Sequence, residues 1–91
     1  MYIDDIVRAH LLALELPQGF HYMNLSGKNA TAVLDVIRML EKILGKQAHV
    51  KHFEFRPGDP FELFADASKA KEVLGWEPQV GLEEGLQKTV E

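Results

Sequence analysis

A helix flanked by two short strand-like segments constrains the fold of this chain more than any other feature. Its apolar residues recur at helical spacing between a capping Thr31 and a terminating Gly45, at Val33, Ile37, Leu40 and Leu44. Residues 20–25 (FHYMNL) and 49–55 (HVKHFEF) have the length and apolar content of strands, the second with imperfect alternation. A helix between two strands permits a parallel crossover, but so few strands cannot form a sheet of their own. The sequence therefore predicts a piece of a larger α/β fold.

A first helix is expected to begin near Ile6, because the carboxylate of Asp4 or Asp5 can accept hydrogen bonds from the free N–H groups of a first turn. Pro17 and Gly19 end it. Two neighbouring faces of this helix are apolar, one made by Ile6, His10 and Ala13 and the other by Val7, Leu11 and Leu14. So wide an apolar surface predicts burial on more than one side.

Two further helices follow in the C-terminal third of the chain. A short extended stretch at residues 62–65 precedes a helix that Asp66 can cap and Gly75 can end. Gly81 opens the last helix, whose first turn carries the anionic side chains that the helix dipole favours. The expected fold is a small mixed α/β unit of about four helices and two to three short strands.

Composition narrows the classes of function. A chain of 91 residues, 46% of them hydrophobic, can form one modest core. Its net charge of -4 argues against nucleic-acid binding, and without cysteine it can form neither disulfides nor a thiolate metal site. Asp4 and Asp5 stand where a signal peptide would need an apolar run, and no apolar stretch is long enough to span a membrane. We expect a cytoplasmic protein that binds neither nucleic acid nor membrane.

The four histidines do not suggest a metal site. His49 and His52 are three residues apart in a predicted strand, where alternation puts them on opposite faces. His10 and His21 have no potential ligand near them in sequence. No catalytic Ser-His-Asp or paired-carboxylate arrangement can be assigned to such scattered residues either.

The turn at residues 56–60 (RPGDP) is the most informative local motif. Pro57 and Gly58 define its backbone, and Asp59, which precedes a proline, is pushed toward an extended conformation that projects its carboxylate. The guanidinium of Arg56 suits the paired oxygens of a phosphate, and a carboxylate beside it can accept hydrogen bonds from ribose hydroxyls. The turn predicts either a nucleotide-binding site or a surface turn in which Arg56 and Asp59 pair with each other.

Aromatic residues are expected mainly in the core, since they supply most of the buried surface of small domains. Trp76, Phe53 and Phe55 belong to this group. Phe61 or Phe64, which closely follow the arginine turn, could instead form a wall of a base or sugar pocket.

Short motifs along nearly the whole chain occur in a recognisable order. They are residues 2–10 (YIDDIVRAH), 22–25 (YMNL), 31–37, 56–59 (RPGD), 65–70 (ADASKA), 74–78 (LGWEP) and 82–86 (LEEGL). In this order and at these separations they resemble the C-terminal third of extended short-chain dehydrogenase/reductases. The NAD-dependent epimerase/dehydratase family, of the UDP-glucose 4-epimerase type, is the most similar.

This resemblance implies a function for the chain. Such enzymes bind NAD in an N-terminal Rossmann domain and oxidise a sugar carried on a nucleoside diphosphate, while the C-terminal part grips the nucleotide. By the same resemblance, Arg56 would contact the diphosphate of a UDP-sugar and Asp59 the ribose of its uridine. Residues 1–91 would then be a single nucleotide-sugar-binding subdomain, the C-terminal portion of a Rossmann-type epimerase fold.

The chain also departs from the family's pattern. The glycine triplet of the dinucleotide fingerprint is absent, since Gly27 stands without a preceding strand–glycine–helix unit. The family's catalytic tyrosine and lysine are four residues apart, but Tyr2 is followed at that distance by Ile6, and Tyr22 by Ser26. We therefore expect that this chain binds no cofactor, holds no catalytic residue and is inactive alone.

Two other functions remain open. The chain could be a stand-alone nucleotide-binding accessory module. It could also be a non-catalytic interaction domain, in which the apolar surface that a Rossmann domain would cover drives self-association.

Overall fold

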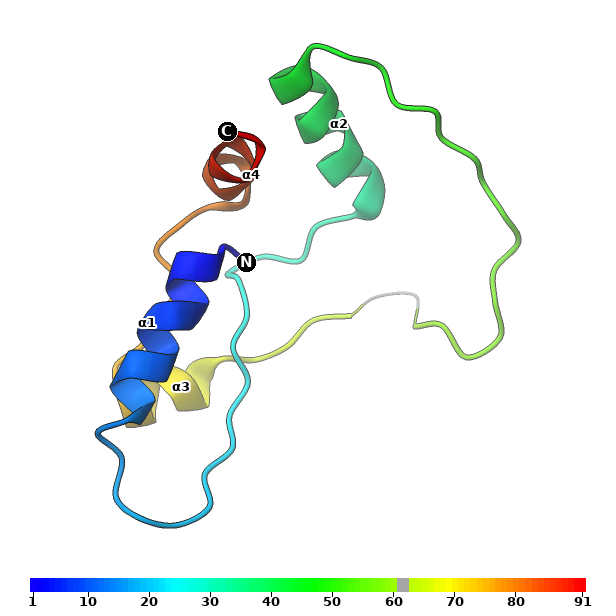
Figure 1. Cartoon of the computed structure of the whole chain (residues 1–91). Helices are drawn as coiled ribbons and strands as arrows, with labels where there is room; N and C mark the ends of the chain where they lie inside the picture. Colours follow the sequence, from blue (N-terminus) through cyan, green and yellow to red (C-terminus); the bar gives the residue numbers. More distant parts are fainter. Residues whose placement is uncertain (61–62) are drawn as a thin grey trace.

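The computed structural model describes residues 1–60 and 63–91. Four helices form its regular structure: α1 (Ile3–Ala13), α2 (Val33–Leu44), α3 (Ser68–Leu74) and α4 (Leu82–Val90). Figure 1 shows them joined by extended connections, of which the one between α2 and α3 makes a wide excursion away from the helices. The prediction of four helices is confirmed. None of the described helices has the length and apolar character needed to span a membrane.

The predicted strands are wrong for the described residues. Residues 20–25, 49–55 and 63–65 have no strand structure, and residue 62, which begins the third predicted strand, lies outside the described part. A strand needs the backbone of a second segment to pair with. Among the described residues, no backbone–backbone hydrogen bond joins residues 20–25 or 49–55 to any other segment. These segments have apolar content suited to strands, but they lack a partner.

The start of α1 also differs from the prediction. The helix begins at Ile3, with Tyr2 at the capping position, so Asp4 and Asp5 lie within its first turn. Neither aspartate caps the helix, because no side-chain hydrogen bond closes its N-terminus. Asp5 is 2% exposed and directs its carboxylate to a distant segment, which is described below.

The other helix ends agree better with the sequence. Thr31 is not the cap of α2, which starts one residue later than expected, after Ala32. Asp66 is not the cap of α3 either, since Ala67 occupies that position, but its carboxylate accepts a hydrogen bond from the backbone N–H of Ser68, the first residue of the helix, at 2.9 Å. Gly45 and Gly75 have φ values of +65° and +68°, which confirms them as left-handed terminators of α2 and α3.

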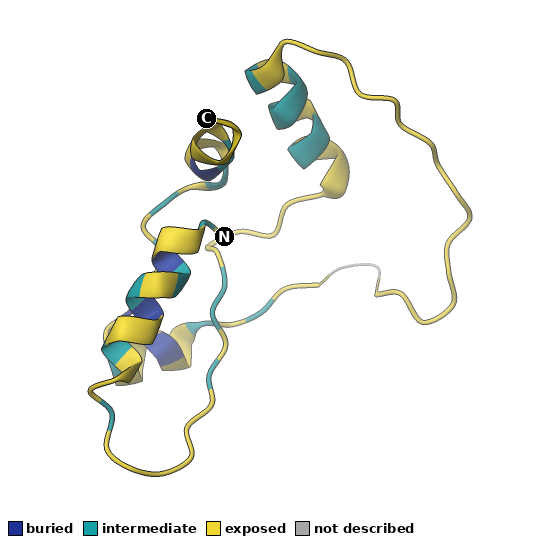
Figure 2. Ribbon diagram, in the orientation of Figure 1, coloured by how far each residue is buried: buried dark blue, intermediate teal, exposed yellow. Residues whose placement is uncertain are grey.

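The core is small and lies between α1, α3 and the segment that follows α3. Ala9, Ala70 and Trp76 are its buried hydrophobic residues, and Trp76 is the largest fully buried side chain in the described part. Partly buried residues packed against them are Leu12, Met23, Leu25, Ala67 and Leu74. The helices pack as two pairs, α1 with α3 and α2 with α4. Figure 2 shows that the buried positions are few and that most of the chain is exposed.

The molecule is flat. It extends 48 × 36 × 16 Å, and its smallest dimension is little more than the roughly 10–12 Å diameter of a helix with its side chains. Its radius of gyration is 16.4 Å, against roughly 12 Å for a compact domain of this length. The chain is therefore flatter and more extended than a compact domain of this length.

Candidate functional site

The turn at residues 56–60 brings the two predicted site residues together. The backbone N–H of Asp59 donates to the carbonyl of Arg56 at 3.2 Å, and Gly58 between them has a φ of +90°. The Nε of Arg56 donates to the Asp59 carboxylate at 3.0 Å. The turn therefore displays a guanidinium beside a carboxylate, as its sequence indicates.

This ion pair leaves most of the guanidinium free. The side chains of Arg56 and Asp59 are 84% and 48% exposed, and an exposed pair contributes only about 0–1 kcal/mol. Within the described residues, Nε is the atom through which Arg56 makes its hydrogen bond. The two terminal nitrogens can still form the fork that suits a phosphate. Pairing between the two residues is thus compatible with ligand binding by either of them.

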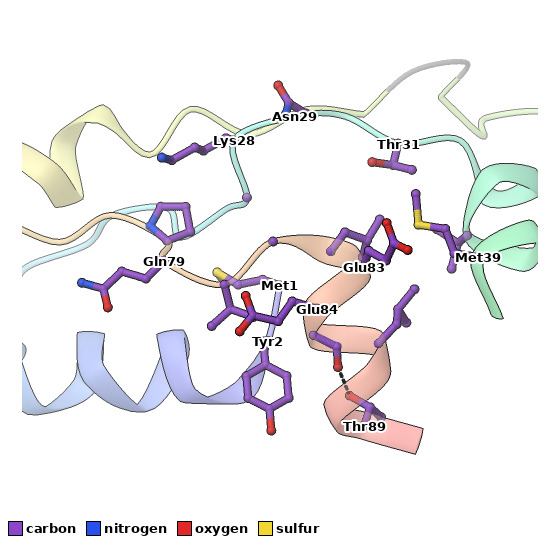
Figure 3. A pocket seen from close by; sticks show the side chains of 18 residues that line it. Met1, Tyr2, Lys28, Asn29, Thr31, Met39, Gln79, Glu83, Glu84 and Thr89 are labelled. Carbon is purple, nitrogen blue, oxygen red and sulfur yellow. Dashed lines mark hydrogen bonds between the residues drawn. The ribbon is translucent and has the colours of Figure 1, made fainter. Parts of the chain in front are cut away.

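A cleft lies elsewhere, where the N-terminal end of α4 faces α2 and the connection that precedes α2. Its volume is about 800 Å³. Figure 3 shows Lys28, Asn29 and Thr31 along one side of the cleft, with Met1 and Glu83 across from them. Its walls come from residues far apart in the chain, so no local motif could have predicted it. Neither Arg56 nor Asp59 lines it.

Charges at this cleft do not form a phosphate site. Gly81, at the start of α4, leaves backbone N–H groups without a side-chain cap, which would favour an anion. The first turn, however, also carries Glu83 and Glu84 at the cleft, and their carboxylates already pair with the ammonium groups of Lys42 (3.8 Å) and Lys88 (3.2 Å). We assign no ligand to it.

The strongest polar network joins α1 to the segment after α3. The Asp5 carboxylate accepts hydrogen bonds from the backbone N–H groups of Gln79 (3.1 Å) and Val80 (3.0 Å) and from the guanidinium of Arg8 (3.0 Å). All side-chain polar atoms that are buried in the described part have a partner. A buried carboxylate satisfied in this way fixes the two segments to each other.

Trp76 and Arg8 complete the network. The indole Nε1–H of Trp76 donates to the carbonyl of Asp5 at 2.8 Å, and the Arg8 guanidinium lies 5.8 Å from the centre of the indole ring. Arg8 also donates to the backbone carbonyl of Glu77. We call Asp5, Arg8, Trp76 and the backbone of residues 77–80 the Asp5 clasp. It joins the YIDDIVRAH and LGWEP motifs, which lie at opposite ends of the chain.

The environment of Asp5 shifts its titration. Burial raises the pKa of its carboxyl, but the hydrogen bonds from Val80, Gln79 and Arg8 and the charge of Arg8 outweigh burial, so the pKa is lowered from its ordinary value. Asp5 is thus a structural carboxylate that stays ionised, unlike a general acid, which needs a raised pKa.

The remaining candidates lie in separate places. Phe64 lines a small pocket of about 220 Å³ together with Trp76 and Ser26, whose hydroxyl donates to the carbonyl of Ala65 at 2.8 Å. Phe61 lies outside the described residues. In residues 1–60 and 63–91, no group of three or more histidine or acidic side chains is placed to hold a metal ion.

Known proteins match this chain over nearly its whole length. A family model described as GDP-mannose 4,6 dehydratase matches residues 1–89. A UDP-glucuronate 4-epimerase of Thermodesulfobacterium geofontis is 42% identical over 90 residues, which are 98% of this chain and 28% of that protein. A UDP-glucose 4-epimerase of Bacillus subtilis is 37% identical over 87 residues, which are 92% of this chain and 26% of that protein.

Solved structures give the same result. The crystal structure of UDP-glucuronic acid 4-epimerase from Bacillus cereus in complex with UDP-glucuronic acid and NAD superimposes with a TM-score of 0.81 at 40% identity. The match covers 96% of this chain and 28% of that one. The fold is therefore related to that of Rossmann-type epimerases, and the chain spans little more than a quarter of the length of these relatives. The chain belongs to the NAD-dependent epimerase/dehydratase family and corresponds to the C-terminal portion of its members.

Proposed function

We propose that this chain is the C-terminal substrate-binding portion of an NAD-dependent epimerase or dehydratase that acts on UDP-sugars, and that it is inactive by itself. The main support is the match of almost the whole chain to 28% of a UDP-glucuronate 4-epimerase. Residues 1–91 would act as one nucleotide-sugar-binding subdomain. The rest of such an enzyme would supply NAD and the proton-transfer groups.

Arg56 and Asp59 would carry the binding role. The free nitrogens of the Arg56 guanidinium would donate to the diphosphate, and the Asp59 carboxylate would accept hydrogen bonds from the ribose. Their mutual ion pair, 3.0 Å between Nε and the carboxylate, would hold the two groups side by side before the ligand arrives. An exposed pair of this kind is weak, so its rearrangement around a ligand would cost little.

Cofactor binding and catalysis would not take place on this chain. The clasp holds Asp5 as a paired, ionised carboxylate, and among its described lining residues the cleft between α2 and α4 has no arginine that could bind the phosphates of NAD. Turnover would depend on groups outside residues 1–91. With NAD and UDP-glucuronate or UDP-galactose added, the isolated chain should produce no epimer above the enzyme-free control; measurable turnover would contradict the proposal.

An NMR titration of the isotopically labelled chain with UDP tests the binding role directly. We expect saturable shifts at residues 56–59 in the native chain and their loss in Arg56→Ala. Arg38→Ala is a matched control, because Arg38 also forms an exposed ion pair with an aspartate three residues away, Asp35, at 3.2 Å. Shifts that survive in Arg56→Ala, or that vanish equally in both variants, would argue against a nucleotide site at this turn.

A further inference from the structure

The connection between α2 and α3 carries the turn at residues 56–60 outside the folded core. Every residue from 46 to 60 is exposed, and among the described residues that follow, Ala65 is the first that is half-buried. Figure 2 shows the described part of this connection as exposed until it approaches α3. The position of the turn is therefore decided by the two ends of the connection.

The end next to α2 is held weakly. The backbone N–H of Ala48 donates to the carboxylate of Glu41 at 3.2 Å, in an exposed bond between residues seven positions apart. Water competes with an exposed bond of this kind, so the bond contributes little. Within the described part of the chain, no backbone–backbone hydrogen bond joins residues 46–60 to another segment. This end therefore sets the position of the turn only loosely.

The end next to α3 is held by Ser26. Its hydroxyl donates to the carbonyl of Ala65 at 2.8 Å, and the two residues, both half-buried, are 39 positions apart in the chain. Leu25, the neighbour of Ser26, packs against the core, as does Ala67 on the other side of the bond. The bond therefore joins the connection to a part of the chain that is itself fixed by packing.

The bond made by Ser26 is also the nearer one to the turn. Asp59 lies six residues before Ala65 and eleven after Ala48. Six residues span at most about 20 Å, so a fixed Ala65 confines the positions that Asp59 can occupy. Without the bond, the next residue packed against the core is Ala67, two positions further along. More of the chain would then have to be ordered when a ligand binds, and each added residue raises the entropy cost.

We propose that Ser26 is a positioning residue for the turn at residues 56–60. Its hydroxyl fixes the point at which the connection rejoins the core, and so holds Arg56 and Asp59 ready for a ligand. In this role Ser26 touches no ligand itself. The consequence for ligand binding rests on the proposed nucleotide role of Arg56 and Asp59, whereas the effect on the order of the turn does not.

Ser26→Ala removes the hydroxyl and tests the proposal in the 91-residue chain by NMR. Without ligand, the backbone order parameters of residues 56–59 and 63–66 should fall in this variant. With UDP, the dissociation constant should rise roughly two- to fivefold, because the net value of one hydrogen bond sets the upper limit. Ser26→Thr retains a hydroxyl at the same position and should restore both measurements.

Thr89→Val is the matched control for the loss of a hydroxyl. Thr89 also donates its hydroxyl to a backbone carbonyl, that of Gly85, at 2.7 Å, but this bond lies within α4. The variant should change neither the order parameters of residues 56–59 nor the affinity for UDP. Ser26→Ala combined with Arg56→Ala should bind UDP no more weakly than Arg56→Ala alone, because Ser26 acts only through the turn.

Several results would overturn the proposal. Residues 56–59 could be as ordered in Ser26→Ala as in the native chain, or lose the same order in Thr89→Val. Ser26→Ala could bind UDP as tightly as the native chain does, or Ser26→Thr as weakly as Ser26→Ala. Loss of cooperative urea unfolding in Ser26→Ala would mean that the hydroxyl holds the core instead of the turn.

Failure of the nucleotide role has a different signature. The native chain would then show no saturable shifts with UDP at residues 56–59, while Ser26→Ala would still lower the order parameters of these residues. That combination would leave Ser26 as a positioning residue of the turn and would count against nucleotide binding by Arg56 and Asp59 alone.

Discussion

The Asp5 clasp and the turn at residues 56–60 both combine an arginine with an aspartate three residues away, yet the two pairs have different surroundings. Arg8 and Asp5 pair at 3.0 Å, as do Arg56 and Asp59. In the clasp, the carboxylate is 3% exposed and also bonds to a segment at the other end of the chain. In the turn, both side chains are exposed and their bonds are local.

This difference shows how one residue pattern can join two segments in one place and remain exposed to solvent in another. The carboxylate of Asp5 is buried and bonded to two segments, so its loss disturbs both of them at once. An exposed pair stabilises little, so it can exchange its partner for a ligand. Changes in the clasp should therefore alter global stability, while changes in the turn should alter binding only.

Trp76→Ala should have the largest effect, because it removes the main buried side chain and the hydrogen bond to the carbonyl of Asp5. Truncation of a buried tryptophan costs about 3–5 kcal/mol, a large share of the stability of a small domain. We expect the variant to lose cooperative urea unfolding followed by circular dichroism. Phe53→Ala is the control, since Phe53 is 81% exposed. An unchanged midpoint in Trp76→Ala would show that the clasp is not the centre of stability.

Asp5→Asn should have the next largest effect. The amide keeps one acceptor oxygen but places an NH₂ group where a carboxylate oxygen accepts from the backbone of Gln79 or Val80. A mismatch of this kind in a buried site costs about 1–3 kcal/mol. Asp35→Asn is the matched control, because Asp35 forms an exposed pair with Arg38. Equal unfolding midpoints for the two variants would mean that the buried carboxylate of Asp5 stabilises the chain no more than the exposed carboxylate of Asp35.

The pH dependence of stability should separate the same two aspartates. Because the folded-state pKa of Asp5 is lowered, its stabilising contribution is fully present above the unfolded-state pKa, about 3.9, and is lost as the pH falls through the folded-state value. The urea concentration at the unfolding midpoint, measured at decreasing pH from pH 7, should therefore begin to decrease once the pH is below about 4. The fall should be smaller in Asp5→Asn than in the native chain and unchanged in Asp35→Asn. Identical acid profiles for all three proteins would mean that Asp5 does not couple folding to pH.

Local features of the fold could be predicted from the sequence. Gly45 and Gly75 end their helices because glycine adopts a left-handed backbone without strain, and this requirement depends on no other segment. The four helices follow from apolar spacing in the same way. The turn at residues 56–60 was also recognisable, since proline and glycine define its backbone.

Features that depend on distant residues could not be predicted. Asp4 or Asp5 was expected to cap a helix. The bonds that Asp5 makes instead, to the backbone of Gln79 and Val80, join segments far apart in the chain and leave no local signal in the sequence. The strand predicted at residues 20–25 was wrong for a related reason, since apolar alternation indicates that a segment suits a sheet but not that a partner strand is present. The large cleft between α2 and α4 has no local signal at all.

Two glycines allow the clasp and the turn to be compared with the smallest change of side chain. Both have positive φ values, and both have open space where the Cβ of a larger residue would lie. Gly75 (φ +68°) ends α3 next to the clasp, and Gly58 (φ +90°) lies in the turn. Alanine at either position strains the backbone by roughly 1–2 kcal/mol. Only at Gly75 is this strain coupled to the core, so Gly75→Ala should lower the urea midpoint measurably.

Gly58→Ala should leave that midpoint unchanged, since the turn can relax without disturbing a buried residue. It should instead weaken any UDP-induced NMR shifts at Arg56 and Asp59, because the turn no longer holds the two side chains together. A fall in the global midpoint equal to that of Gly75→Ala would mean that the turn is coupled to the core. The region proposed to bind a nucleotide would then be part of the region that keeps the chain folded.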